Sequence, residues 1–138
     1  MAQTVLWEVV DGIGRLELNR PESLNALSFD MMEALDEASA ALVQRTDLRV
    51  LVVSGQGGHF MAGGDIRDFS RLLDRTPGER RETFRTAIEQ RVNPVVERLS
   101  RVPCPVVAKV SGACAGFGMS LMLACDLAIA SSDAVFTT

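Results

Sequence analysis

The chain contains no tyrosine, one tryptophan, one histidine and one lysine among its 138 residues. Because His59 is the only imidazole, a Ser-His-Asp triad or a histidine-based metal site would have to be built on that residue alone. The three cysteines, at positions 104, 114 and 125, do not have zinc-ligand spacing, and their odd number argues against a disulfide framework. We therefore expect no metal site, and we interpret the cysteines as buried, reduced thiols.

Features that would indicate other classes of protein are also missing. The net charge of −4 disfavours nucleic-acid binding, which needs a basic face. No apolar run is long enough to span a bilayer, and residues 1–8 lack the basic and apolar regions of a signal peptide. A composition that is 47% hydrophobic and 23% charged is typical of one globular domain with a core. We expect a cytoplasmic protein that binds neither nucleic acid nor membrane.

The hydrophobic pattern predicts an α/β fold. Residues 5–10 and 13–18 flank Asp11-Gly12, which predicts a β-hairpin, and residues 50–54, 106–110 and 127–130 are typical of buried strands. Ser28 is a good cap for a helix that runs to about residue 45. A capping-box pattern at Thr76 predicts a long helix to about residue 101, with a kink or break at Pro94. This alternation predicts βαβ units with right-handed crossovers.

Two glycine-bearing turns, at residues 60–66 and 112–118, are the most informative feature of the sequence. Each is expected to follow a strand and to open a helix, where the first backbone N–H groups have no acceptor inside the helix. Two such turns directed at one point would form an oxyanion hole, and glycine would allow a substrate to approach the backbone closely. A phosphate-binding loop is the weaker interpretation, because the second turn lacks the Lys-Ser/Thr of a P-loop and the spacing of a dinucleotide fingerprint.

Several motifs, in this order and spacing, together resemble the crotonase family, also called the enoyl-CoA hydratase/isomerase superfamily. They are Leu18-Asn19-Arg20-Pro21 with Asn25-Ala26-Leu27, the two glycine turns, and Ala124-Cys125-Asp126-Leu127-Ala128. The resemblance implies an α/β, crotonase-like spiral of ββα/βαβ units with a parallel sheet core. Family members are roughly twice as long, and residues 134–138 resemble the start of a strand. Residues 1–138 are therefore expected to be the N-terminal core of a truncated crotonase-like domain.

The resemblance also implies a substrate and a set of site residues. Family members bind acyl-CoA thioesters without a separate cofactor and stabilise a thioester enolate. Carried over residue by residue, the backbone N–H groups of Gly64 and Phe117 would be the catalytic donors. The CoA-binding positions would be Asn25, Ala26 and Leu27 along the CoA channel, Ala62 beside the adenine, and Arg67 as a nearby basic residue. The substrate-binding set is completed by Asp65, Ile66 and Ser120, although a helix cap is the favoured role of Asp65.

One position departs from the hydratases of the family. Ser120 stands where they carry a glutamate, and a hydroxyl cannot act as a general base near neutral pH. We therefore expect isomerase-like rather than hydratase chemistry, with the general base beyond residue 138. The alternative is a non-catalytic acyl-CoA-binding paralogue that has lost its acid–base residues. The resemblance also implies a homotrimer or hexamer for the full-length protein.

Overall fold

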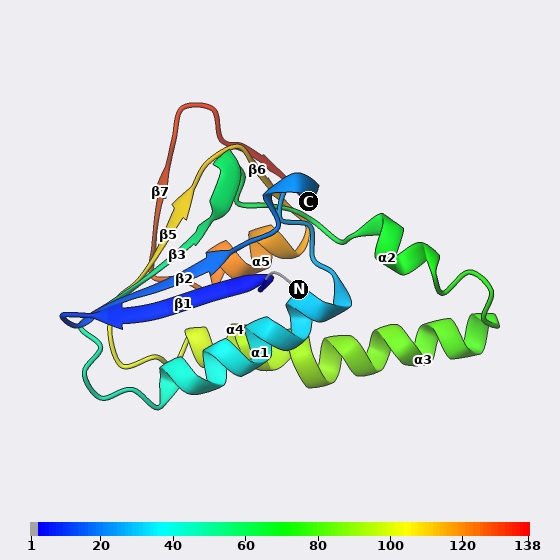
Figure 1. Ribbon diagram of the computed structural model, residues 1–138, viewed down its shortest axis with the longest axis horizontal. Coiled ribbons are helices and arrows are strands. Elements are labelled where there is room, and N and C mark those ends of the chain that lie inside the picture. Colours follow the sequence, from blue (N-terminus) through cyan, green and yellow to red (C-terminus); the bar gives the residue numbers. More distant parts are fainter. Residues whose placement is uncertain (1–2) are drawn as a thin grey trace.

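The computed structural model describes residues 3–138, and its main element is a five-stranded sheet of order β1-β2-β3-β5-β7 (Figure 1). Only β1 and β2 are antiparallel; the other neighbours in this sheet run parallel. The strands are β1 (Val5–Val10), β2 (Ile13–Leu18), β3 (Val50–Gly55), β5 (Val106–Val110) and β7 (Leu127–Ala130). The predicted α/β class and its parallel core are confirmed.

The hairpin between β1 and β2 turns at Asp11-Gly12, as predicted. Asp11 has φ 52° and Gly12 has φ 79°, so both residues adopt the left-handed conformation that a two-residue hairpin turn requires. The register pairs Val10 with Ile13 next to the turn and Val5 with Leu18 at the far end.

A second sheet of three short parallel strands carries the glycine turns. Its strands are β4 (Met61–Ala62), β6 (Ala113–Ala115) and β8 (Val135–Thr137), in that order. Each is the next strand along the chain after a strand of the first sheet: β4 after β3, β6 after β5, and β8 after β7. Each successive unit, β3–β4, β5–β6 and β7–β8, therefore adds one strand to each sheet beside the previous unit. This arrangement is the expected spiral. The sequence predicted turns at residues 61–62 and 113–115, because strands of two or three residues are too short to show an alternation of apolar and polar side chains.

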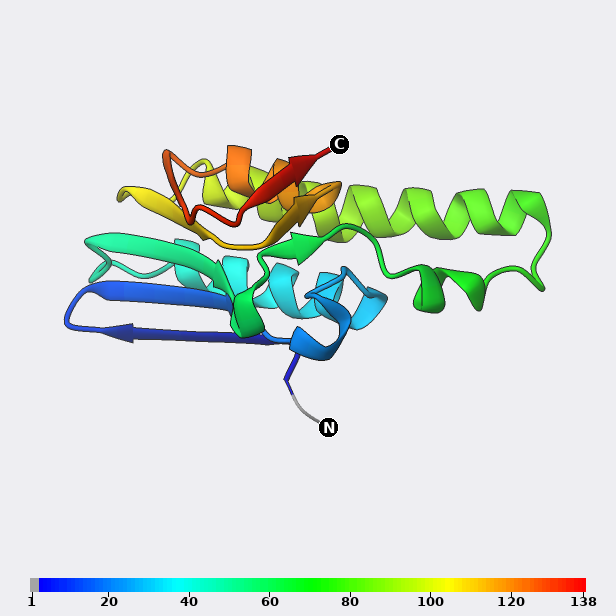
Figure 2. The same ribbon diagram turned by 90° about the horizontal axis from the view of Figure 1, so that it is seen from above.

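The helices pack beside the five-stranded sheet or extend away from it. The α-helices are α1 (Phe29–Val43), α2 (Ile66–Ser70), α3 (Pro77–Ala87), α4 (Asn93–Leu99) and α5 (Phe117–Leu123), and two short 3₁₀ turns are η1 (Pro21–Ser23) and η2 (Gln56–Gly58). In both views α2 and the first half of α3 extend beyond the strands (Figures 1 and 2). Ser28 caps α1 by accepting the N–H of Met31, as its sequence position predicts.

The helix predicted from Thr76 to about residue 101 is continuous up to Leu99, and it neither breaks nor ends at Pro94. Instead, α3 and α4 are joined by a π-helical turn, η3 (Ile88–Val92), in which the N–H of Asn93 donates to the carbonyl of Ile88. Proline has no N–H, and its ring displaces the carbonyl four residues earlier. The wider turn accommodates both effects without interrupting the helix.

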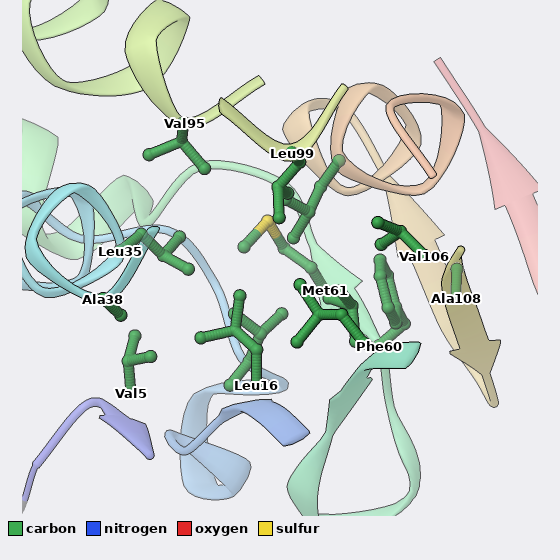
Figure 3. Packing of buried hydrophobic residues seen from close by; sticks show 14 of the residues in the cluster. Val5, Leu16, Leu35, Ala38, Phe60, Met61, Val95, Leu99, Val106 and Ala108 are labelled. Atoms are coloured by element: carbon green, nitrogen blue, oxygen red, sulfur yellow. The ribbon is translucent and has the colours of Figure 1, made fainter. Parts of the chain in front are cut away.

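The hydrophobic core lies between the five-stranded sheet and the helices α1 and α4 (Figure 3). Alternate strand residues such as Leu16, Leu51 and Val106 are fully or almost fully buried, as are Leu35 of α1 and Leu99 of α4. Phe60 and Met61 are also fully buried in this cluster. The first glycine turn is thus anchored to the core through the two residues at its start.

The described cysteines are free thiols, as interpreted from their spacing. Cys114 is buried, and Cys104 and Cys125 are partly buried. Burial raises the pKa of all three, and burial together with the charge of Asp126 raises that of Cys125 to about 12. Since the thiolate is the nucleophilic form, none of these thiols is activated at neutral pH. Within residues 3–138, no helix combines the length and apolar character needed to cross a membrane.

Candidate functional site

The two glycine turns lie side by side because the strands that precede them are paired. β4 and β6 are parallel, with Met61 opposite Cys114 and Ala62 opposite Ala115. Gly63 and Gly116 follow these paired strands, and Gly64 and Phe117 are the next residues of the two turns. A Cβ atom added to Gly116 would lie 3.3 Å from the Cα of Gly63, so the two backbones are in contact there.

The backbone N–H groups of Gly64 and Phe117 have no acceptor within residues 3–138. The N–H of Leu27 donates to the carbonyl of Gly63 at 2.7 Å, and the carbonyl of Leu27 accepts the N–H of Asp65 at 2.9 Å. The N–H of Gly64, between these two residues, is left without an acceptor. Phe117 is the first residue of α5, where a helix leaves its N–H groups unpaired. These N–H groups are thus free to donate to a ligand oxygen.

Both residues line an apolar groove of about 650 Å³, which we call the inner groove. Leu27 and Ser120 line it too, so four of the residues singled out in the sequence meet here. One wall is the continuous helix from α3 to α4, which contributes Phe84, Ile88, Val92 and Val96 at intervals of four residues. On a regular α-helix a spacing of four drifts by about 40° per step. The π turn contains more residues per turn, so it reduces this drift and helps to keep the four side chains on one wall.

Phe69 and Phe84 line this groove, and Phe29 packs against both of them. The ring centroid of Phe69 lies 5.0 Å from that of Phe84, and the two rings meet edge to face. The ring centroid of Phe29 lies 5.5 Å from that of Phe69. A Cβ atom at position 64 would lie 2.4 Å from the Cε2 atom of Phe69. Glycine at position 64 therefore allows the ring of Phe69 to pack beneath the turn. This packing requirement is separate from the space that a ligand would need near the backbone.

A smaller groove of about 290 Å³ adjoins the first at Gly64, and we call it the outer groove. Ala26, Asp65, Ile66 and Arg67 line it, as do Glu22, Ser23 and Leu24. Arg67 is exposed and Ile66 is 82% exposed, so a positive charge and an apolar side chain lie open to solvent beside the first turn. Six of the eight residues that the resemblance assigned to substrate binding are thus divided between two adjoining grooves, and Asn25 and Ala62 line neither.

Asp65 is the cap of α2, as the sequence analysis favoured. Its Oδ1 accepts the N–H groups of Arg67 and Asp68, and its Oδ2 accepts from Arg20 at 2.7 Å. Burial raises the pKa of Asp65, but the hydrogen bonds from Arg20 and from the Asp68 and Arg67 amides outweigh burial and hold that pKa below its ordinary value. The carboxylate is ionised and fully engaged, so it fixes the start of α2 rather than acting as a proton donor.

Asn25, which the resemblance assigned to the CoA channel, is fully buried and lines neither of the two grooves. The side chain accepts the N–H of Arg20 at 2.8 Å and donates to the carbonyls of Gln56 and His59 at 2.9 and 2.7 Å. Its role is structural, because these bonds join the loop after β2 to the segment that leads into the first glycine turn.

The other positions assigned to the CoA channel and the adenine lie in different surroundings. Leu27 is 4% exposed and lines the inner groove, whereas Ala26 lines the outer one. The N–H of Ala62 is already donated to the carbonyl of Leu24. His59 lies in a loop, as interpreted, and its Nδ1 accepts the N–H of Ala113, which ties the second turn to the first.

Sequence reasoning missed the helical wall of the inner groove, including Phe84 and Glu97. The only signal was the four-residue spacing of apolar residues from Phe84 to Val96, which is also typical of an ordinary core-facing helix. Within residues 3–138, no group of three or more His, Cys, Asp or Glu side chains could hold a metal ion.

Comparisons with known proteins agree on one family. A family model described as "Enoyl-CoA hydratase/isomerase" matches residues 8–138. A 1,2-epoxyphenylacetyl-CoA isomerase of Escherichia coli is 35% identical over 136 residues, which are 99% of this chain and 50% of that protein. A peroxisomal Delta(3,5)-Delta(2,4)-dienoyl-CoA isomerase of Arabidopsis thaliana is 34% identical over 88% of this chain and 45% of its own length.

A solved structure gives the same result for the fold. AtuE of Pseudomonas aeruginosa superimposes with a TM-score of 0.84 at 38% identity, covering 96% of this chain and 50% of that protein. The chain thus spans about half the length of the relatives it matches.

Proposed function

The chain belongs to the enoyl-CoA hydratase/isomerase family, and from this premise we propose that it acts on an acyl-CoA thioester held by two backbone N–H groups. The donors are the amides of Gly64 and Phe117, and they bind the thioester oxygen. The observation that supports the proposal is the pairing of β4 with β6, because each of these neighbouring strands leads into a turn with an unpaired amide, and both turns line the inner groove. The α-carbon of a thioester becomes more acidic when two such donors stabilise the oxygen of the enolate.

The two grooves accommodate the two parts of such a substrate. The inner groove is lined mainly by apolar and aromatic side chains, which suits an acyl chain. The outer groove begins at Gly64 and carries Arg67, whose guanidinium suits a phosphate of the CoA portion. In this arrangement the thioester lies at Gly64, where the grooves meet.

Isomerisation fits the site better than hydration. Ser120 lines the inner groove where the hydratases of the family carry a glutamate, and a hydroxyl cannot activate water near neutral pH. The Escherichia coli and Arabidopsis thaliana relatives both carry the name of an isomerase. The proposed reaction is the movement of a carbon–carbon double bond relative to the thioester.

The test removes one donor while the helix stays intact. Phe117 is the first residue of α5, a position where proline is tolerated, so Phe117→Pro deletes the N–H without breaking the helix. Phe117→Ala is the matched control, because it removes the same ring and keeps the N–H. With hexanoyl-CoA labelled with ¹³C at the thioester carbonyl, infrared spectroscopy measures how strongly the bound carbonyl is polarised.

We expect the carbonyl band to shift to lower frequency on the wild-type chain and on Phe117→Ala, and to shift much less on Phe117→Pro. The loss of one such donor also lowers turnover by about 100- to 1,000-fold in enzymes of known mechanism. Equal shifts for the proline and alanine variants would contradict the assigned donors. Polarised binding with no turnover of any enoyl-CoA would favour the alternative function, a non-catalytic acyl-CoA-binding protein.

A further inference from the structure

One carboxylate lines the inner groove together with the two unpaired amides. Among the lining residues of that groove, Glu97 of α4 is the single ionisable side chain. It shares the groove with Gly64, Phe117 and Ser120, which come from the two glycine turns and from α5. The inner groove therefore contains a carboxylate from within the chain, whereas the general base was expected beyond residue 138.

The carboxylate of Glu97 is not engaged by another part of the described chain. Other charged side chains on the same helical run are paired, such as Glu82 with Arg85 at 3.0 Å, and Arg91 and Arg98 with Asp36 of α1. Within residues 3–138, Glu97 forms no ion pair, and the hydrogen bond at this residue uses its backbone carbonyl, which accepts from Ser100. Its side chain is exposed to the groove and free to accept a proton.

The helix that carries Glu97 is held firmly in place. Val95 and Leu99, on either side of Glu97 in the sequence, are each 1% exposed and fix α4 against the core (Figure 3). Arg98, the next residue, is tied to Asp36 of α1. A side chain on a rigid, packed helix retains its position relative to the glycine turns, which general acid–base catalysis requires.

We propose that Glu97 is the catalytic residue that moves the proton during double-bond isomerisation of a 3-enoyl thioester. This inference rests on the proposed function of the same site. Glu97 removes a proton from the α-carbon, and the electron pair of that C–H bond enters the enolate whose oxygen is held by Gly64 and Phe117. The protonated Glu97 then delivers the proton to the γ-carbon. The double bond moves from C3 to C2, the carboxylate is regenerated, and no other reactant is consumed.

The experiment compares turnover with binding in the wild-type chain and three variants. Turnover is measured with 3-hexenoyl-CoA, from the absorbance of the conjugated 2-enoyl thioester, and binding is measured with hexanoyl-CoA by calorimetry. Glu97→Gln keeps the size of the side chain and removes its basicity. Glu89→Gln is the matched control, because Glu89 is an exposed glutamate of the same helical run that does not line the groove.

We expect Glu97→Gln to lower turnover by about 100- to 10,000-fold while hexanoyl-CoA binds as it does to the wild-type chain. Glu89→Gln should match the wild-type chain in both measurements. Glu97→Asp should retain part of the turnover, because it keeps a carboxylate and shortens its reach.

Four outcomes would overturn the assignment of Glu97. Undiminished turnover in Glu97→Gln, or loss of binding together with turnover in that variant, would exclude a proton-transfer role while the acyl-CoA function stands. A wild-type chain that binds hexanoyl-CoA without converting 3-hexenoyl-CoA would exclude it too, and would favour the binding protein. A wild-type chain that does neither would overturn the proposed function, and the role of Glu97 with it.

Discussion

At the scale of single residues, buried hydrogen-bonding side chains hold the backbone that forms the site. Asn25 joins three segments: it accepts from the backbone of Arg20 and donates to the carbonyls of Gln56 and His59. Its own backbone is in the left-handed conformation, with φ 55°, which asparagine adopts more readily than most residues. The segment from Gln56 to His59 leads into the first glycine turn, so Asn25 acts on the site through the backbone.

We therefore predict that Asn25→Ala lowers the free energy of unfolding by about 3 kcal/mol, because it leaves two carbonyls and one N–H unpaired in the interior. Chemical denaturation followed by circular dichroism measures this loss. Asn19→Ala is the control, since the side chain of Asn19 makes an exposed hydrogen bond to the carbonyl of Gln3. Equal stability of the two variants would contradict the structural role of Asn25.

At the scale of elements, an ion-pair cluster joins α1 to the helical wall of the inner groove. Asp36 of α1 accepts from Arg91 of the π turn at 3.0 Å and from Arg98 of α4. Burial raises the pKa of Asp36, but the hydrogen bonds and charges of Arg98 and Arg91 outweigh burial and hold the pKa below its ordinary value. The side chain of Asp36 is 14% exposed, so this pair is less screened than a surface pair.

Asp36→Asn should lower the free energy of unfolding by about 1 kcal/mol at pH 7. The folded pKa is below the unfolded value of about 3.9, so this contribution is complete above that pH and is lost as the pH falls through the folded pKa. The stability difference between wild type and variant should thus narrow below about pH 4. Urea denaturation at several pH values measures the free energy of unfolding of both proteins, and hence this difference.

Glu82→Gln provides the control for that series. Glu82 pairs with Arg85 on α3, but both side chains are more than 60% exposed, so its loss should change stability very little. If Asp36→Asn is no more destabilising than Glu82→Gln, or if its effect is the same at pH 3 and pH 7, the cluster does not stabilise the wall as argued.

At the scale of the whole molecule, apolar side chains are exposed along the last strands. Leu127 and Ile129 of β7 are 63% and 67% exposed, and Val135 and Phe136 of β8 are 64% and 44% exposed. Both strands lie at the edge of their sheets. Exposed apolar edge strands favour pairing with other chains.

We predict that the 138-residue chain self-associates and that the double variant Leu127→Lys, Ile129→Lys weakens this association with little change in melting temperature. Sedimentation velocity over a range of concentrations measures the extent of self-association. Leu73→Lys is the control, because Leu73 is 66% exposed but lies outside these strands. A wild-type chain that stays monomeric at every concentration would contradict the prediction. The homotrimer or hexamer that the resemblance implies for a full-length protein remains a separate prediction.

The features that the sequence determined by itself depend on neighbours within a few residues. Asp11-Gly12 fixes its hairpin, Ser28 and Asp65 cap their helices, and the glycine turns lie between a strand and a helix, because backbone conformation at these sites depends on local geometry. Conversely, the two strands β4 and β6 are too short to leave a pattern in the sequence.

The tertiary structure alone decided which distant residues meet. The partners of Asn25 lie 31 and 34 residues away, so no local pattern could distinguish a buried structural amide from a ligand-binding one. Likewise, Glu97 lines the groove only because α4 packs on the core, and the two glycine turns come together only because β4 pairs with β6. Such contacts depend on strand pairing and packing over the whole chain, whereas the turns and caps are determined by the few residues that form them.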